Sequence, residues 1–190
     1  MGRIMINQHV PFFSSFFTES IDLESVDISR ELISGLKDTD NGNTRSNQGG
    51  WHSEDFTSDT LWSGPMVKAV TEAIIPVYTS MGIIKEPKLQ GFWVNINTPG
   101  DYNLSHSHPG SYLSACLFID VPKDSGSFVF ERTDNLLDFI SASVMNPNNF
   151  GDWKIDPSNG DLVIFPSNMK HYVERNNSTR DRISIAFNFA

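Results

Sequence analysis

The sequence has a single cysteine, Cys116, among its 190 residues. One cysteine cannot form a disulfide within the chain, and structural zinc sites built from thiolates need at least two. This excludes the small disulfide-stapled domains and the thiolate zinc folds. A chain that needs no disulfide suits a reducing compartment, so the composition predicts a cytoplasmic protein.

Long apolar runs and a surplus of basic residues are also missing. No stretch of about 18 apolar residues occurs, so the sequence predicts no membrane-spanning helix. Lys and Arg number 14 against 23 Asp and Glu, which gives a formal net charge of −9. Binding to a phosphate backbone depends on clustered basic residues, and this balance therefore disfavours a nucleic-acid partner.

The first 86 residues have the pattern of helices joined by a long polar loop. Apolar residues recur at helical spacing in 24–36 and again in 66–82, where Pro76 is expected to end or kink the second helix. Residues 38–60 between them are dense in Asn, Gly, Ser and Asp, which is loop composition. A loop this long in a compact domain is often a lid over a binding site, and a plain surface loop is the alternative.

From residue 87 onward the pattern changes to short apolar runs separated by turn sequences such as VPKDSG and DPSNGD. The runs with strand character are 89–96, 112–120, 127–130, 162–165 and 183–189. Many short strands behind a helical front predict a β-sandwich or jelly roll. We therefore expect one domain over 1–190, with helical support and a loop or lid in 1–86 and the β core in 87–190.

Three histidines have the spacing of metal ligands. His106 and His108 are two residues apart, so on an extended chain both imidazoles project from the same face. His171 follows a later apolar run and a short turn. Imidazole suits iron, zinc, copper or nickel, and three ligands on one face leave coordination positions for a substrate. The alternative is chance, since five histidines in 190 residues sometimes form His-x-His on a solvated loop.

Two of the apolar runs carry polar residues on the face opposite to their large side chains. In the last run Arg182 and Ser184 share a face, and a guanidinium beside a hydroxyl is suited to a carboxylate; an edge arginine that faces water is the alternative. In the first run Asn95 and Asn97 share a face with Trp93. A buried amide without partners costs roughly 1–3 kcal/mol, so these two need a ligand, a water molecule or a solvent-facing sheet.

In this order the features resemble the 2-oxoglutarate and Fe(II)-dependent oxygenase superfamily, on its prolyl-hydroxylase-like side. The segments that carry the resemblance lie within 90–190 and read WVNINTPGDYNLSHSHPGSYLSACLFIDVP, GSFVF, PSNGDLVIFPSNMKHYV and RISIAFN. The likeness is greatest to a family of small oxygenases whose substrates are unknown. It implies a mainly β (α+β) fold, a double-stranded β-helix of the jelly-roll, cupin-like type with supporting N-terminal helices.

The resemblance implies that His106 and His171 bind Fe(II). The superfamily usually has a carboxylate two residues after the first histidine, and His108 stands there instead. Three arrangements are open. His108 is itself a ligand, which is the arrangement we favour; a carboxylate from elsewhere, Glu131 or Asp101, completes the site; or the position has no protein ligand.

The resemblance also implies a binding site for 2-oxoglutarate. Arg182 and Ser184 match the Arg-x-Ser that holds the far carboxylate of this cosubstrate, and Asn95 and Asn97 match a polar pair that contacts it. Phe118 stands where related hydroxylases often have a tyrosine that bonds the cosubstrate. Losing that bond removes roughly 0.5–1.5 kcal/mol, so Arg182 is expected to carry a larger share of the binding.

The sequence thus predicts an Fe(II)- and 2-oxoglutarate-dependent dioxygenase that uses O2 to hydroxylate a peptide or small-molecule substrate. A cupin-like three-histidine dioxygenase without 2-oxoglutarate is one alternative. A non-enzymatic jelly-roll binding protein is the other. The sequence identifies neither the substrate nor the oligomeric state.

Overall fold

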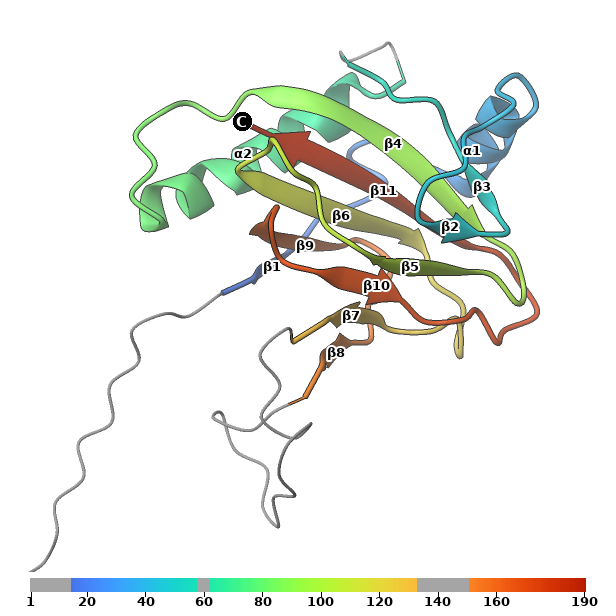
Figure 1. Ribbon diagram of the computed structural model, residues 1–190. Helices are drawn as coiled ribbons and strands as arrows, with labels where there is room; N and C mark the ends of the chain where they lie inside the picture. The colour runs from blue at the N-terminus through green and yellow to red at the C-terminus, as the bar shows by residue number, and fades with distance from the viewer. Residues whose placement is uncertain (1–14, 58–61, 133–150) are drawn as a thin grey trace, which may run out of the picture.

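The computed structural model describes residues 15–57, 62–132 and 151–190, and in these ranges two antiparallel sheets face each other (Figure 1). The larger sheet has the strand order β1 (Phe17–Ser20), β9 (Asp161–Pro166), β6 (Leu113–Asp120), β11 (Arg182–Phe189), β4 (Leu89–Asn97), β3 (Trp51–His52). The smaller sheet has the order β2 (Asn47–Gln48), β5 (Tyr102–His106), β10 (His171–Val173), β7 (Phe128–Phe130), β8 (Trp153–Ile155). Two facing antiparallel sheets confirm the predicted mainly β, jelly-roll fold.

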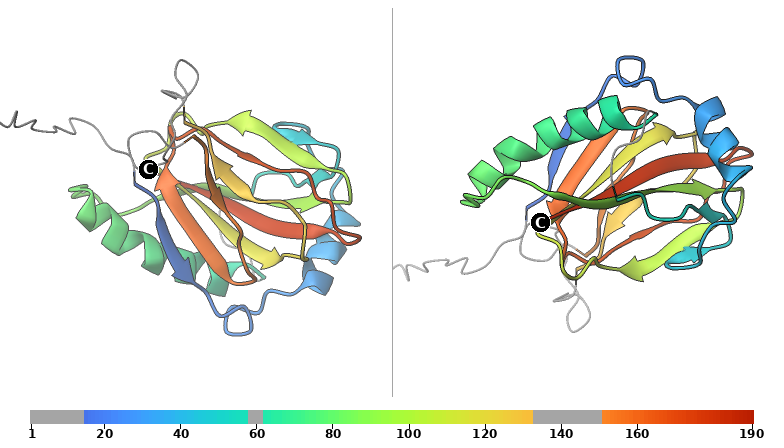
Figure 2. Two further views of the ribbon diagram at one scale, coloured as in Figure 1. Left: turned by 90° about the horizontal axis from the view of Figure 1, so that it is seen from below. Right: turned by 90° about the horizontal axis from the view of Figure 1, so that it is seen from above.

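The helices α1 (Arg30–Lys37) and α2 (Gly64–Ser80) pack on the face of the larger sheet that points away from the smaller one (Figure 2). Helix α2 buries residues spaced three or four apart against this face: Met66, Val70, Ile74 and Val77. A second apolar cluster fills the space between the sheets and includes Phe118, Phe128 and Phe165. The molecule therefore has three layers, and polar groups between the sheets are shielded from water.

Both predicted helices exist, but their boundaries differ from expectation. Helix α1 begins at Arg30 rather than near residue 24, because Asp27 has a φ of 53° and the Ser29 hydroxyl accepts a hydrogen bond from the Leu32 N–H as an N-cap. Helix α2 passes through Pro76 to Ser80. Pro76 was expected to end or kink this helix, and it does not end it, because this residue is exposed while its neighbours Ile74 and Val77 hold the helix on the sheet.

The predicted alternation on β4 and β11 is present. Phe92, Val94 and Ile96 join the core with the helices, as do Ile183 and Phe187 on β11. The polar faces of both strands consequently point between the two sheets. Because β4 and β11 are direct neighbours, Arg182 lies opposite Asn97, and Ser184 lies opposite Asn95.

The segment 38–60, expected to be a loop, contains two short strands. The turn at Gly49 and Gly50, both at positive φ, lets β2 pair with β5 and β3 pair with β4. The strand β1 also lies in the part for which only helices and a loop were expected. Residues 1–14 and 58–61 of that part lie outside the described ranges.

Neither helix of the described ranges combines the length and the hydropathy that crossing a bilayer requires.

Candidate metal centre

The structure brings the three predicted histidines together. His106 ends β5 and lies in register with His171, the first residue of β10, while His108 follows β5 by two residues. One ligand nitrogen from each ring lies within 4.8 Å of the other two. The ring centroids are 4.3 to 5.1 Å apart. The strands β5 and β10, with the residues that follow β5, thus bring three imidazoles close enough to bind one ion.

Backbone carbonyls fix the tautomers of two of these rings. Nδ1 of His106 lies 2.8 Å from the Leu104 carbonyl, and Nδ1 of His171 lies 3.0 Å from the Met169 carbonyl. A carbonyl oxygen only accepts, so each Nδ1 carries the hydrogen and each Nε2 keeps its lone pair for a metal ion. Nε2 of His108 is 3.3 Å from Nε2 of His171. Two nitrogens that bind one ion at about 2.1 Å are themselves about 3.0–3.4 Å apart, so this geometry fits a metal.

Burial keeps the three imidazoles neutral. Desolvation is the largest cause of a lowered pKa in all three, and the charge of neighbouring histidines acts in the same direction. The pKa of His108 falls to about 4 and that of His171 to about 3. Neutral imidazole is the form that binds metals, so the cluster is ready for an ion at neutral pH.

The two carboxylates considered as alternative ligands have other partners. Asp101 accepts hydrogen bonds from the backbone N–H and the hydroxyl of Thr98. Glu131 accepts a hydrogen bond from the Ser105 hydroxyl. In the part of the chain that the structure describes, no Asp, Glu or Cys joins the three histidines in the metal-binding group.

A narrow cavity of about 40 Å³ lies between the sheets and reaches the histidines. The side chains that line it include polar groups of the larger sheet: Asn95, Cys116 and Ser184. Cys116 shares a hydrogen bond with Ser184, and burial raises the pKa of its thiol to about 12. The thiol is therefore a neutral part of the wall.

Arg182 stands at the start of β11 on the same face as Ser184, and only 1% of it is exposed. Its Nη1 donates to the carbonyls of Ser125 (3.2 Å) and Gly126 (3.3 Å), and its Nη2 donates to Oδ1 of Asn97 (2.8 Å). Nε has no partner among the described residues. Burial lowers the pKa of Arg182 to about 10, so the group is a cation at neutral pH.

The partners of this buried cation are all neutral, and the described residues form no ion pair with it. An isolated buried charge is costly unless an opposite charge or further hydrogen bonds compensate it. The free Nε donor and the missing negative charge are what a site for a carboxylate ligand requires. The surroundings of Arg182 therefore fit a carboxylate ligand, and Ser184, two residues along the same strand, lines the cavity that reaches the histidines.

The two predicted asparagines have different surroundings. Asn95 lines the cavity. Asn97 contacts Arg182, and its own Nδ2 donates to Oδ1 of Asn103 at 3.1 Å. Nδ2 of Asn103 in turn donates to the Ser46 hydroxyl. Sequence reasoning missed this chain of contacts, because Asn103 lies in a stretch with turn composition and only the pairing of β2 with β5 brings Ser46 beside it.

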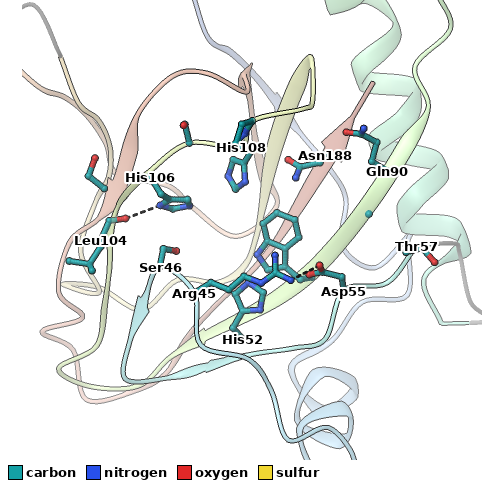
Figure 3. Close-up of a pocket in the computed structure, with 15 residues that line it drawn as sticks. Arg45, Ser46, His52, Asp55, Thr57, Gln90, Leu104, His106, His108 and Asn188 are labelled. Atoms are coloured by element: carbon teal, nitrogen blue, oxygen red, sulfur yellow. Dashed lines mark hydrogen bonds and ion pairs between the residues drawn. The ribbon is translucent and has the colours of Figure 1, made fainter.

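A larger pocket of about 460 Å³ opens beside the histidines (Figure 3). Residues of the segment 38–60 form one wall: Arg45, Ser46, His52, Asp55 and Thr57. The opposite wall includes His106 and His108. The segment is anchored, since the Ser53 N–H donates to the Val94 carbonyl.

The comparison with protein families decides the assignment. A family model described as "Putative 2OG-Fe(II) oxygenase" matches residues 91–188, which include all three histidines and Arg182. The chain belongs to this family. It is a dioxygenase of the 2-oxoglutarate and Fe(II)-dependent class, with iron and 2-oxoglutarate as its cofactors. The match favours the predicted dioxygenase over a cupin-like enzyme without 2-oxoglutarate and over a non-enzymatic binding protein.

Solved structures of 2OG-Fe(II) oxygenases share the fold at low sequence identity. A Pseudomonas putida prolyl-4-hydroxylase is 14% identical, with a TM-score of 0.63 over 93% of this chain and 92% of that chain. A viral collagen prolyl hydroxylase from Paramecium Bursaria Chlorella virus-1 is 12% identical, with a TM-score of 0.60 over 92% and 94%. HygX from Streptomyces hygroscopicus, with nickel, 2-oxoglutarate and hygromycin B bound, is 11% identical, with a TM-score of 0.61 over 93% and 83%. No curated protein matches the sequence.

Proposed function

We propose that this oxygenase holds Fe(II) on His106, His108 and His171, and holds the far carboxylate of 2-oxoglutarate on Arg182 and Ser184. The observation that carries the second assignment is the buried guanidinium, which has only neutral partners and a free Nε donor. A carboxylate bound there both neutralises the charge and accepts the missing hydrogen bond.

With both cofactors bound, the iron centre would supply the activation of O2 that couples the oxidative decarboxylation of 2-oxoglutarate to succinate and CO2 with the hydroxylation of a substrate C–H bond. The protein's own part is to bind and orient. Its Leu104 and Met169 carbonyls set the ring orientation of two ligands. The apolar residues between the sheets exclude water from the cavity.

Three imidazoles in place of two imidazoles and a carboxylate leave the centre one charge more positive. This charge and that of Arg182 both attract a dianionic cosubstrate. The hydrogen bond missing at Phe118, which is buried among aromatic side chains, is thereby offset electrostatically.

Asn97 acts in this proposal as a positioning residue, because its Oδ1 and two backbone carbonyls hold the guanidinium in place. Asn95 provides a polar group on the cavity wall, where it orients the cosubstrate. Residues 45–57 form one wall of the larger pocket, in which a peptide or small-molecule substrate binds. A cytoplasmic location agrees with a single, buried cysteine and with an iron centre that works in the ferrous state.

Thermal unfolding of the anaerobic protein with Mn(II) and 2-oxoglutarate tests the assignment. A ligand that binds only the folded state raises Tm. We expect Mn(II) to raise Tm, 2-oxoglutarate to raise it further, and Arg182→Gln to abolish the second shift while the first is kept. The matched control is Arg180→Gln, at an exposed arginine that pairs with Asp120.

Two results would overturn the proposal. A 2-oxoglutarate shift that persists in Arg182→Gln removes the role of the guanidinium. A Mn(II) shift that survives alanine substitution of His106 and His171 removes the metal site. The Mn(II) shift also reports whether each variant is folded, so loss of the 2-oxoglutarate shift alone is interpretable.

A further inference from the structure

The larger pocket has two chemically different sides. Arg45, His52 and Asp55 gather on one side, and His106 and His108 lie across from them (Figure 3). The charged side belongs to the segment 38–60, and the histidines belong to β5 and the residues that follow it. A molecule in this pocket can thus be held at one end while its other end faces the histidines.

The charges on the first side form an ion pair that is not saturated. Nη2 of Arg45 donates to Oδ2 of Asp55 at 2.7 Å, and the two side chains are exposed, at 53% and 38%. The other guanidinium donors and the second carboxylate oxygen have no partner in the described residues. Both members of the pair can therefore bind a ligand without breaking their mutual contact.

A pair of this kind selects ligands by charge. A ligand with one charge is attracted by one member of the pair and repelled by the other, so the two effects largely cancel. A zwitterion places its anion on the guanidinium and its ammonium on the free carboxylate oxygen, and both contacts are favourable. Its own two charges need no further counter-ion from the wall.

His52 adds an acceptor on the same side. Its Nδ1 lies 2.7 Å from the Ser53 carbonyl, so Nδ1 carries the hydrogen and Nε2 is an acceptor. Only 2% of the residue is exposed, and Nε2 has no partner among the described residues. A buried ring on a pocket wall whose free nitrogen accepts hydrogen bonds suits a ligand N–H group.

The indole of Trp93 connects the two sides. It stacks on His52, with ring centroids 5.6 Å apart and an interplanar angle of 13°, and its centroid is 5.4 Å from that of His108. An aromatic face between the charged side and the metal ligands suits the hydrocarbon part of a ligand. The pocket volume of about 460 Å³ is in the range of small-molecule sites.

We infer that the substrate is a small zwitterion of the amino acid class, with its carboxylate on Arg45, its ammonium on Asp55 and His52, and its side chain over Trp93 toward the histidines. This inference rests on the proposed function, since it takes the three histidines as the site of reaction. It also predicts that the oxidised carbon belongs to the side chain and not to the α position.

Paramagnetic relaxation tests the inference on the full chain loaded with Mn(II) and 2-oxoglutarate. The probes are the free L-amino acids, each compared with its N-acetyl derivative and its carboxamide, which keep one charge. We expect Mn(II) to broaden the proton signals of at least one free amino acid, its side-chain protons more than its α proton. The two blocked derivatives should show at least a tenfold weaker effect.

The variants Arg45→Gln and Asp55→Asn should each weaken the binding of this amino acid by at least tenfold. The proton signals of 2-oxoglutarate should be broadened as in the wild type. Arg180→Gln is the matched control and should change nothing. The exchanged pair Arg45→Asp with Asp55→Arg should recover part of the loss, which separates a charge effect from a folding defect.

Three outcomes would overturn the inference. In the first, the signals of the free amino acids are not broadened while those of 2-oxoglutarate are. This outcome leaves the proposed function intact and points to a protein or an uncharged substrate. In the second, the blocked derivatives bind as well as the zwitterion. In the third, the variants Arg45→Gln and Asp55→Asn bind the zwitterion as the wild type does. If 2-oxoglutarate itself is not broadened, the proposed function fails, and the inference fails with it.

Discussion

Replacing Asn97 by aspartate is a sharp test of the buried guanidinium. Asn97→Asp keeps the size of the side chain and puts a negative charge 2.8 Å from Nη2 of Arg182, where an amide oxygen now accepts. The variant supplies internally the counter-charge that the described residues lack. We expect its affinity for 2-oxoglutarate to fall. In the metal-free protein the new ion pair should stabilise the fold, and the loss of the Nδ2 donor to Asn103 offsets part of this gain.

The size of the loss follows from Coulomb's law. A cosubstrate carboxylate on the free Nε side of the guanidinium lies about 6 Å from the new carboxylate. At an effective dielectric constant of about 20, two like charges at this distance repel by about 2.8 kcal/mol. This corresponds to a dissociation constant for 2-oxoglutarate that is about 100-fold higher.

Titration calorimetry with 2-oxoglutarate on the anaerobic Mn(II) protein measures this change, and urea unfolding measures the stability. The matched control is Asn103→Asp, the same substitution one step further along the network, where Asn103 contacts Asn97 and Ser46 rather than the guanidinium. Asn103→Asp should lose clearly less affinity for 2-oxoglutarate than Asn97→Asp. Unchanged 2-oxoglutarate affinity in Asn97→Asp, or an equal loss in both variants, would refute the reasoning.

Three further predictions concern the metal ligands and a helix. His171→Ala should lower the affinity for Mn(II) by more than about 100-fold, since the loss of a residue that only supports a metal ligand already costs 10–100-fold. Metal analysis after dialysis measures this, and retention of Mn(II) at the wild-type level would contradict it. The folded-state pKa values of His108 and His171, about 4 and about 3, lie below the value of about 6.5 in the unfolded chain. The unfolded state therefore binds protons first, and the unfolding free energy of the metal-free protein should fall as the pH drops from about 6.5 toward 4. Urea unfolding across this range should show a shallower fall in His171→Gln, and an equal slope would speak against buried neutral rings. Pro76→Ala should raise the unfolding free energy by about 1–3 kcal/mol, because it restores a donor on the exposed face of α2; no gain would mean that the helix has relaxed around the proline.

Much of the fold could be predicted because the signals were local. The alternation along β4 and β11 predicted that Arg182 and Ser184 share a face and that Asn95 and Asn97 share a face. It left open whether these faces meet water, and the strand pairing and the core packing show that they point between the sheets. The spacing of His106 and His108 likewise predicted that their rings share a face. Bringing His171 to them required the pairing of β10 with β5, for which the family resemblance supplied the expectation.

The substrate side of the site could not be predicted in the same way. Arg45, His52 and Asp55 lie in a polar segment without periodicity, and they meet the histidines only because two-residue strands pair with β4 and β5. Such strands are too short to leave a pattern in the sequence. The continuation of α2 through Pro76 also depends on tertiary packing, which overrides local preference.

A crystal structure of the protein with Mn(II) and 2-oxoglutarate tests the central claim most directly. We expect Mn(II) on Nε2 of His106, His108 and His171, and a cosubstrate carboxylate on Arg182 and Ser184. Coordination of the ion by Glu131 or Asp101 in place of His108, or a cosubstrate without contact to the guanidinium, would contradict it.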